Sequence, residues 1–283
     1  MSDIGNDPVA GPAALASQRA NEFMHTLGNL AKNLGVHHGS LAKNPSTAAV
    51  IVSGGTGERF GNPSGKQLFE ILSKPALTWS LEAFDATPDV GLIVLVCPDE
   101  QRERFKKVAI EPFEFVTPIT FACSGDIRQE SAMNGVDAVS SEYDFIAIHD
   151  GARPLVTPEI ITHAINLIKG NLDADGVCVG HPSIDTLKVV NGNSIAGTPE
   201  RSLFWVAQTP QVFRADICRR AYSTAMFDGF VGTDDSSLVE RMGGNVLMLD
   251  GSRDNIKLTV PEDVGPIVAT LAKRLASQDN TLD

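Results

Sequence analysis

The sequence has few cysteines, no long apolar run and no excess of basic residues. Its four cysteines lie far apart and form no C-x-x-C pair, and a chain of 283 residues can bury a core without disulfides. We therefore expect a reducing, cytoplasmic environment. No apolar run approaches the ~18 residues that suggest a membrane span. Asp3 and Asp7 stand where a signal peptide carries positive charge, so we expect neither a membrane span nor export.

Acidic residues outnumber basic residues by 35 to 23, which gives a net charge of −12. A surface of this sign repels nucleic acid and anionic membranes, so we expect neither as a partner. Lysine and arginine are nevertheless concentrated at a few loop positions. This pattern favours a protein that binds a small anion at those loops.

A glycine-rich loop follows the first strongly apolar stretch, Val50–Val52. From residue 53 to residue 67 it reads S-G-G-T-G-E-R-F-G-N-P-S-G-K-Q. Glycines lack Cβ and let backbone N–H groups close on phosphate oxygens, and Arg59 and Lys66 add charge that backbone dipoles cannot supply. The sequence thus predicts a phosphate-binding loop at the end of a buried strand, built on Gly54, Gly55 and Gly57.

The glycine spacing separates this loop from the two commonest nucleotide-binding loops. Gly55-x-Gly57 is followed by three residues before Gly61, where a dinucleotide-binding fingerprint has two. Gly61-x-x-x-Gly65 has three spacer residues where a P-loop has four, and Gln67 replaces the magnesium-binding Ser or Thr. The pattern G-G-T-G-x-R-x-G followed by K-Q instead resembles nucleotidyltransferases that activate a phosphorylated or sugar substrate. A glycine-rich turn with incidental basic residues is the alternative.

The chain is predicted to contain an extension, one main domain and a short tail, over residues 1–47, 48–276 and 277–283. The extension carries one amphipathic helix, between Pro12 and Gly35, and a linker. In the main domain, strands are expected at 48–53, 91–97, 119–123, 144–149 and 175–181, and helices near 75–86, 99–109, 128–139 and 158–170. This alternation predicts an α/β fold with a mostly parallel sheet flanked by helices, in which ligands bind beyond the carboxyl ends of the strands.

Two more motifs follow predicted strands. Residues 124–131, S-G-D-I-R-Q-E-S, lead into a helix on which Arg128, Ser131 and Gly135 share one face. That face suits a small flat ligand such as a pyrimidine base, and a capped turn with a surface arginine is the alternative. In H-D-G-A-R-P, Asp150 directly follows a buried strand, where a carboxylate must be paired, solvated or near a metal ion. We expect the preceding His149 to be a packing residue rather than a catalytic base.

The alternation stops beyond residue 184. The stretch from Asp185 to Arg201, with a turn at 191–193, predicts a β-hairpin arm at about 185–205. The arm has too few apolar residues to fold alone, so we expect it to pack against a second subunit. Helices are expected near 214–227 and 234–242. Residues 254–260 are predicted to form a strand that points Lys257 into the cleft and Ile256 into the core.

Five motifs now stand in order: the glycine-rich loop, G-D-I-R-Q-E-S, H-D-G-A-R-P, D-T-L-K with W-V-A-Q-T-P-Q, and D-N-I-K-L-T-V-P-E-D. Together they closely resemble the 2-C-methyl-D-erythritol 4-phosphate cytidylyltransferases, the CTP-consuming enzymes of the non-mevalonate isoprenoid pathway, over about residues 47–275. The resemblance implies transfer of a cytidylyl group from CTP to 2-C-methyl-D-erythritol 4-phosphate. It also implies a Rossmann-like fold, a homodimer joined by the β-arm, and Mg²⁺ bound mainly through the CTP phosphates.

The resemblance implies roles for individual residues. Arg59 and Lys66 match residues that stabilise the transition state. Arg201 and Lys257 match residues that position the methylerythritol phosphate, with Arg201 acting from the neighbouring subunit. The nucleotide-binding positions are matched by Ser53, Gly54, Gly55, Gly57, Gly125, Asp126, Ser131, Asp150 and Gly151. Contacts with the second substrate are matched by Arg153, Thr186 and Asp234.

The chain departs from the family pattern at two places. Family members often have Ala-Ala-Gly where this chain has Ser53-Gly54-Gly55, and H-D-A-A-R-P where this chain has Gly151. Both changes keep small residues, so we expect nucleotide binding to survive. A ribitol 5-phosphate cytidylyltransferase and a CTP-sensing protein without turnover are the alternatives. The motifs D-T-L-K and N-I-K-L-T-V-P-E-D favour the isoprenoid enzyme, and Arg201 and Lys257 argue against a sensor, which needs only the triphosphate site.

Overall fold

The computed structural model describes residues 45–55, 60–61 and 65–279. The amphipathic helix predicted in the extension lies outside the described residues, and so do Gly57 and Arg59 of the glycine-rich loop. In the described part, no helix is long and apolar enough to cross a membrane.

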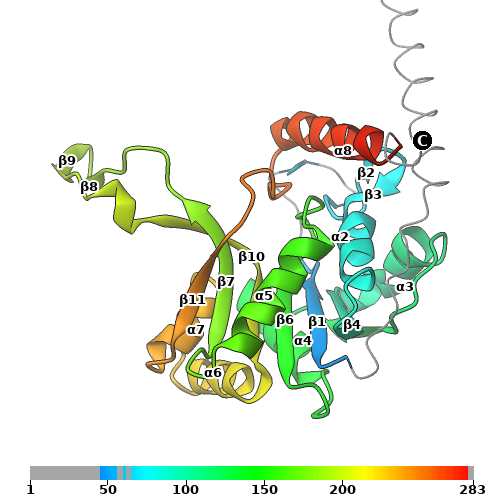
Figure 1. Ribbon diagram of the computed structural model, residues 1–283, viewed down its shortest axis with the longest axis horizontal. Coiled ribbons are helices and arrows are strands. Elements are labelled where there is room, and N and C mark those ends of the chain that lie inside the picture. The colour runs from blue at the N-terminus through cyan, green and yellow to red at the C-terminus, as the bar shows by residue number, and fades with distance from the viewer. Residues whose placement is uncertain (1–44, 56–59, 62–64, 280–283) are drawn as a thin grey trace, which may run out of the picture.

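A seven-stranded sheet forms the centre of the molecule, in the order β11-β7-β10-β6-β1-β4-β5 (Figure 1). Five of its strands confirm the predicted ones: β1 Thr47–Val52, β4 Val90–Cys97, β5 Ile119–Cys123, β6 Phe145–Asp150 and β7 Gly176–Pro182. The other two are β10 Trp205–Arg214 and β11 Val246–Asp250. β10 runs antiparallel to β6 and β7, and all other neighbours are parallel. The sheet is therefore mostly parallel, as predicted.

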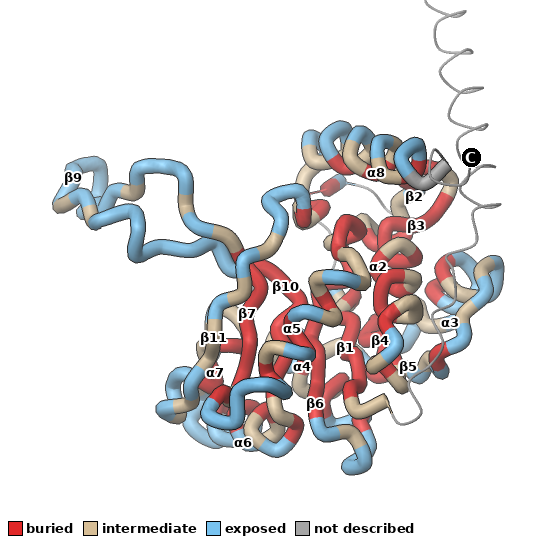
Figure 2. The backbone as a smooth tube through the Cα atoms, viewed as in Figure 1, coloured by how far each residue is buried: buried red, intermediate tan, exposed pale blue. Residues whose placement is uncertain are grey.

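Helices cover both faces of the sheet, and the buried backbone lies between them (Figure 2). One face packs against α2 Ala76–Asp85 and α5 Pro158–Gly170. The other packs against α4 Arg128–Asp137, α6 Ala215–Phe227 and α7 Asp235–Arg241. α5 shows why these helices form where they do: the Thr157 side chain accepts the Ile160 N–H at its start, Pro158 opens its first turn, and its buried residues are Ile161, Ala164, Ile165 and Ile168. That spacing places one apolar face on the sheet.

A third apolar cluster lies beyond the carboxyl ends of the central strands. It joins α8 Val264–Asp279 to the small sheet of β2 Glu70–Ile71 and β3 Lys74–Pro75. Buried Leu258 belongs to this cluster and ties the segment before α8 to the body. The short helix η5 Pro261–Asp263 separates that segment from α8. The cluster thereby holds the chain around Lys257 next to the end of the sheet.

The structure corrects two predictions about local structure. The strand predicted at 254–260 is wrong, because Leu258 N–H bonds the Ala152 carbonyl and the backbone N–H groups of Thr259 and Val260 bond the Asp263 carboxylate, so no strand partner is used. The single helix predicted near 99–109 is split into η2 Asp99–Gln101, α3 Arg102–Phe105 and the π-helical η3 Lys106–Ile110.

The predicted hairpin arm is present as β8 Val189–Asn191 and β9 Ser194–Gly197, followed by η4 Arg201–Leu203. It projects away from the body and is exposed along most of its length (Figures 1 and 2). Its exposed apolar side chains include Val189, Val190, Ile195 and Leu203. Apolar groups on a thin projection cannot bury one another, so the arm favours association with another surface, and its role in a dimer stays a prediction.

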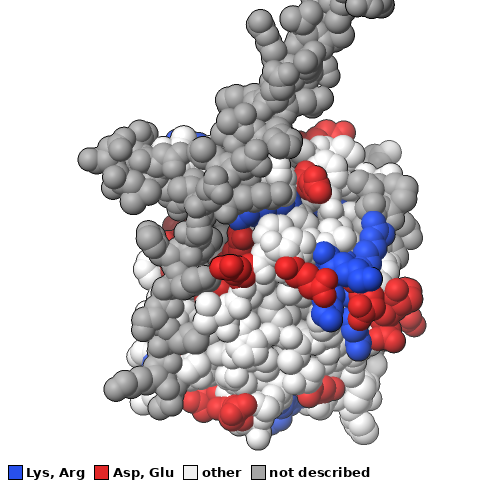
Figure 3. All heavy atoms as spheres, turned by 90° about the vertical axis from the view of Figure 1, so that its right-hand side faces the viewer, with Lys and Arg blue, Asp and Glu red and all other residues white. Residues whose placement is uncertain are grey.

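The face that contains α3 carries charges of both signs, side by side (Figure 3). Along the segment from η2 to the end of η3, Arg102 pairs with Asp99 at 2.7 Å, and Lys106 lies 3.7 Å from Glu111. Two of the basic side chains there, Arg102 and Lys106, are thus close to carboxylates of the same chain.

Candidate active site

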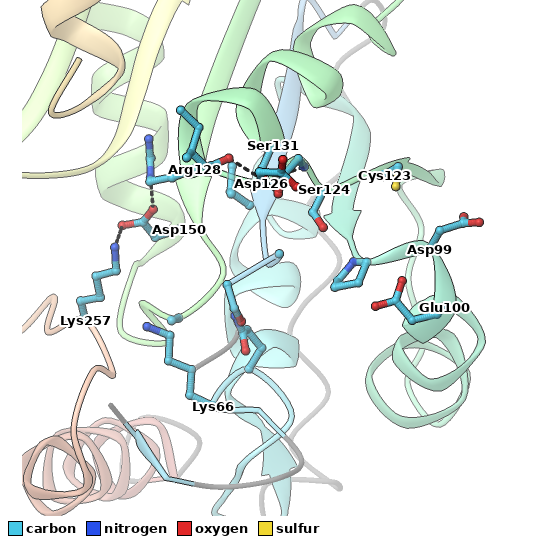
Figure 4. Close-up of a pocket in the computed structure, with 18 residues that line it drawn as sticks. Lys66, Asp99, Glu100, Cys123, Ser124, Asp126, Arg128, Ser131, Asp150 and Lys257 are labelled. Atoms are coloured by element: carbon cyan, nitrogen blue, oxygen red, sulfur yellow. Dashed lines mark hydrogen bonds and ion pairs between the residues drawn. The ribbon is translucent and has the colours of Figure 1, made fainter. Parts of the chain in front are cut away.

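A cavity of about 620 Å³ opens where β1, β5 and β6 end (Figure 4). Ligands of parallel α/β sheets bind at this edge, because the loops that follow adjacent strands meet there. Three predicted motifs supply walls: the glycine-rich loop, the segment after β5, and the region of Asp150 after β6. Lys257 adds a fourth from the segment before α8.

The described part of the glycine-rich loop brings Gly54, Gly55 and Lys66 to the cavity. A Cβ at Gly54 would lie 2.3 Å from Ser124 Cβ, so glycine is required there by packing against the segment after β5. At Gly55 a Cβ would meet only Gln67 Nε2, at 3.9 Å, which leaves open space beside the backbone. Gln67 itself is buried, and its Nε2 donates to the Gly55 carbonyl at 3.2 Å. The side chain of Gln67 therefore braces the loop rather than binding a metal ion.

Asp150 is the centre of a charged cluster in the wall of the cavity. Its Oδ1 accepts from Arg128 Nε at 2.9 Å, and its Oδ2 lies 2.8 Å from Lys257 Nζ and 3.6 Å from Arg153 Nε. Burial alone would raise the pKa of Asp150, but the positive charges of Arg128, Lys257 and Arg153 outweigh burial and hold the pKa well below its usual range. Asp150 is thus a carboxylate at neutral pH, and it holds Lys257 at the cavity.

His149, directly before Asp150, is fully buried. Its Nδ1 lies 3.0 Å from Thr209 Oγ1, which also accepts the Asp150 N–H at 3.0 Å. Burial lowers the pKa of His149 to about 3, so the ring is neutral at physiological pH. The expectation that His149 is a packing residue agrees with this placement.

The segment after β5 forms the other wall. Gly125 N–H donates to Ser131 Oγ at 3.0 Å, and Ser131 Oγ donates to the Ile127 carbonyl at 3.0 Å. Glu130 Oε2 accepts the Asp126 N–H at 2.8 Å, which fixes the turn and leaves the Asp126 side chain exposed at the cavity. Gly135 does not face a ligand, contrary to the interpretation of the shared helix face. A Cβ there would lie 2.3 Å from Val50 Cγ1, so this glycine lets α4 pack closely on β1.

The cavity has a charge gradient along its length. Lys66, Lys257 and Arg128 lie toward one end, together with Asp150, while Asp99 and Glu100 lie at the opposite rim (Figure 4). An elongated anion with a neutral end matches this arrangement, with its charged groups at the lysines.

Ser53 and Gly151, where the chain departs from the family pattern, are packed against each other. A Cβ at Gly151 would lie 2.2 Å from Ser53 Oγ and 3.0 Å from Leu77 Cδ1. The glycine therefore accommodates the serine, and the space beside its Cα is filled by protein atoms rather than open to a ligand. Ser53 is 1% exposed, and its Oγ has no hydrogen-bond partner among the described residues. The two departures compensate in volume beneath the cavity.

We expect Gly151→Ala to lower kcat/KM by about tenfold, or roughly 1.4 kcal/mol of barrier. The new Cβ would collide with Ser53 Oγ and shift the peptide that follows Asp150. Steady-state kinetics of the double variant Ser53→Ala/Gly151→Ala should show recovery to within about threefold of wild type. Gly170→Ala, where a Cβ meets nothing within 4 Å, is the matched control. A double variant as impaired as Gly151→Ala would refute the packing explanation.

Other residues singled out from the sequence lie away from the cavity walls. Thr186 and Arg201 are exposed on the arm, where Arg201 NH1 donates to the Ile184 carbonyl at 2.7 Å. Asp234 caps α7, accepting the Ser237 N–H at 3.0 Å and Gln211 Nε2 at 2.8 Å. Arg153 donates to the Asn255 carbonyl at 2.8 Å behind Asp150. Within one chain the cavity is therefore formed without the arm.

The sequence alone does not point to Asp235 as a residue of the site, and it leaves Arg128 open between a ligand contact and a surface arginine. Asp235 is 2% exposed and forms two hydrogen bonds with Arg128. The neighbouring acids in T-D-D were a signal, because one carboxylate is enough to cap a helix and the second is then free for another partner.

Comparisons with known proteins show the family to which the chain is related. Residues 47–273 match the sequence profile of the family described as 2-C-methyl-D-erythritol 4-phosphate cytidylyltransferase. A protein of that name from Caldanaerobacter subterraneus subsp. tengcongensis is 40% identical over 230 residues, covering 81% of this chain and 99% of its own. A protein of that name from Syntrophotalea carbinolica is 37% identical over 220 residues, covering 77% and 93%.

Solved structures share the fold. The structure of 4-diphosphocytidyl-2C-methyl-D-erythritol synthase from Anaerococcus prevotii superposes with a TM-score of 0.71 at 24% identity, covering 81% of this chain and 99% of that one. A second structure, titled 4-diphosphocytidyl-2C-methyl-D-erythritol synthase, gives a TM-score of 0.65 at 29% identity, covering 80% and 99%. The α/β architecture and its mostly parallel sheet are thus those of the relatives.

Proposed function

Because the chain belongs to the 2-C-methyl-D-erythritol 4-phosphate cytidylyltransferase family, we propose that it transfers a cytidylyl group from CTP to 2-C-methyl-D-erythritol 4-phosphate and releases pyrophosphate. The observation that carries this proposal is that one cavity is lined by cationic side chains at one end and by a small polar turn in its wall. Lys66, Lys257 and Arg128 supply the charge for phosphates, and the turn at Gly125–Ser131 offers room for a base.

The reaction needs positioning and charge neutralisation rather than a general base. A sugar phosphate is already an anionic nucleophile near neutral pH, so in-line attack on the α-phosphate of CTP requires no proton removal. The neutral, buried His149 fits that requirement. Repulsion between two anions is the main obstacle, and we assign Arg59 and Lys66 to the charge that develops on the α-phosphate and on pyrophosphate. We assign Lys257 to the phosphate of the second substrate.

Mg²⁺ fits this donor set as an ion carried by the nucleotide. Among the described residues, no three His, Cys, Asp or Glu side chains are grouped as a metal site. Mg²⁺ is commonly held by one or two carboxylates together with substrate phosphates, and Asp150 is a carboxylate at the cationic end of the cavity that could join them. When bound, the ion would neutralise phosphate charge during the transfer.

We assign the base to the segment after β5. Cytosine presents an amino group and two acceptors, and the exposed Asp126 carboxylate with the backbone around Gly125 offers complementary groups. A pocket built to receive that amino group leaves an acceptor unpaired when uracil binds. We therefore propose CTP rather than UTP as the nucleotide.

The exposed arm is the basis of our proposal for how two subunits associate. Arg201 and Thr186 lie on the projecting hairpin rather than at the cavity, and the arm exposes apolar side chains. We propose a homodimer in which each arm reaches the partner subunit, so that Arg201 completes the partner's site. All four cysteines are unpaired, which fits the reducing cytoplasm as the site of action.

Cys123 gives a direct test of nucleotide binding. It is exposed at the cavity, while the other three cysteines are buried. Burial raises the pKa of Cys97 to about 11 and that of Cys178 to about 12, which lowers their reactivity. We expect a small maleimide to label one thiol per folded chain, and saturating CTP with Mg²⁺ to slow labelling by at least about tenfold.

Mass spectrometry of the labelled chain checks this expectation. Cys123→Ser should remove the rapid labelling, and UTP at the same concentration should protect less than CTP. Equal labelling rates with and without CTP, at concentrations that support turnover, would show that the nucleotide does not occupy this cavity.

A further inference from the structure

Arg128 is held between two carboxylates from different elements. Its Nε contacts Asp150 Oδ1 at 2.9 Å, while NH1 and NH2 contact the two oxygens of Asp235 at 2.7 and 2.9 Å. Arg128 opens α4, Asp150 ends β6, and Asp235 opens α7. A two-pronged contact of this kind fixes the plane of a guanidinium as well as its position.

Asp235 is itself fixed from behind. The hydroxyl of Tyr222, on α6, donates to Asp235 Oδ1 at 2.6 Å. Asp235 and Tyr222 are each 2% exposed, and Tyr222 belongs to the apolar cluster that covers one face of the sheet. A buried carboxylate is costly unless it is paired, and here one arginine and one hydroxyl satisfy it. The pair therefore anchors Arg128 to the core.

The orientation of Arg128 determines how Asp150 is shared. Only Nε of Arg128 faces Asp150, so Arg128 uses Oδ1 and Lys257 approaches Oδ2, at 2.8 Å. Without Asp235, both terminal nitrogens of Arg128 would be free to turn toward Asp150. A two-pronged contact with Asp150 would then compete with Lys257 for the same carboxylate.

We propose that Asp235 and Tyr222 form a positioning pair for the nucleotide site: they orient Arg128 so that Asp150 keeps one oxygen for Lys257. Neither residue lines the cavity, so both act through Arg128. The proposal rests on the assignment of the cavity to CTP. It extends the site into the helical layer of α6 and α7, which carries none of the motif loops around the cavity.

The test is a set of variants assayed for pyrophosphate release and for CTP binding by calorimetry. Asp235→Asn keeps the shape of the side chain but removes its charge, and it should lower kcat/KM by at least about tenfold. Tyr222→Phe removes one hydroxyl and should lower kcat/KM by about threefold. Asp228→Asn is the matched control, because Asp228 pairs with Arg241 at the surface between the same two helices, and it should stay within about twofold of wild type.

A double variant separates positioning from a general effect on the fold. In an Arg128→Ala background Asp235 no longer has a cation to orient, so adding Asp235→Asn should leave kcat/KM unchanged. It should also raise Tm relative to Arg128→Ala, because it removes an unpaired buried charge. If instead the two losses in kcat/KM multiply, Asp235 does not act through Arg128 and the proposal is wrong.

The remaining outcomes are also decisive. A folded Asp235→Asn variant with wild-type kcat/KM would overturn the proposal. Should that variant not fold, Tyr222→Phe decides: a raised KM for CTP with unchanged Tm supports positioning, and unchanged kinetics refute it. Wild-type protein that neither binds CTP nor releases pyrophosphate would instead refute the proposed function, and calorimetry distinguishes that result from a failure of the positioning pair alone.

Discussion

Lys66→Ala should lower kcat by about a hundredfold or more and leave the fold intact. Lys66 lies on the glycine-rich loop and lines the cavity, so its charge is close to any phosphate bound there. Removing one charge-assisted contact that strengthens in the transition state costs on the order of 3 kcal/mol. Because the loss falls on the transition state, KM for CTP should change much less than kcat.

Steady-state kinetics, with Tm measured in parallel, check this expectation. Lys106→Ala is the matched control, since Lys106 is exposed at the start of η3 near Glu111, and the change should leave kcat within about twofold. A Lys66→Ala enzyme that retains half of the wild-type kcat would remove Lys66 from the mechanism.

Mixing two inactive variants should restore activity if the active site is shared between subunits. Arg201→Ala and Lys66→Ala lesions lie on the arm and on the cavity loop, which are separate within one chain. In a heterodimer with exchanged arms, both lesions fall in one site and the other site is intact. Equal mixing with complete subunit exchange should therefore yield about a quarter of wild-type activity.

The readout is pyrophosphate release after subunit exchange, with native mass spectrometry to count heterodimers. Each variant alone, treated in the same way, is the control. A mixture that contains heterodimers but stays inactive would show that Arg201 serves its own subunit, and the proposed shared site would then be wrong.

The sequence predicted the part of the fold that depends on local pattern. The apolar run at Val50–Val52, the glycine-rich loop and the capped start of α5 each carry their signal within a few residues. β10 and β11 were not predicted as strands. Pro210 and several polar residues interrupt the apolar pattern of β10, and its place between β6 and β7 is set by pairing across the sheet. Residues 254–260 look like a strand but are held by a carbonyl after β6 and by the Asp263 carboxylate.

In the site, too, the sequence did not predict contacts between side chains that are distant along the chain. Separate motifs indicated Asp150 and Lys257. Their 2.8 Å contact joins segments about a hundred residues apart, and patterns of residue spacing cannot predict a contact over that distance in the chain. Gly151 was a visible departure from the family pattern, but its reason is Ser53 Oγ, a neighbour in space rather than in sequence. Asp235 stands next to Asp234, the cap of α7, and its contact with Arg128 spans 107 positions of the chain, so no local pattern predicts it.

The most direct test of the central claim is product analysis with purified protein, CTP, Mg²⁺ and 2-C-methyl-D-erythritol 4-phosphate. We expect equal amounts of pyrophosphate and a cytidine diphosphate adduct of the sugar alcohol, with much slower reaction when UTP replaces CTP or ribitol 5-phosphate replaces the acceptor. Absence of the adduct with methylerythritol phosphate, or faster turnover with ribitol 5-phosphate, would contradict it.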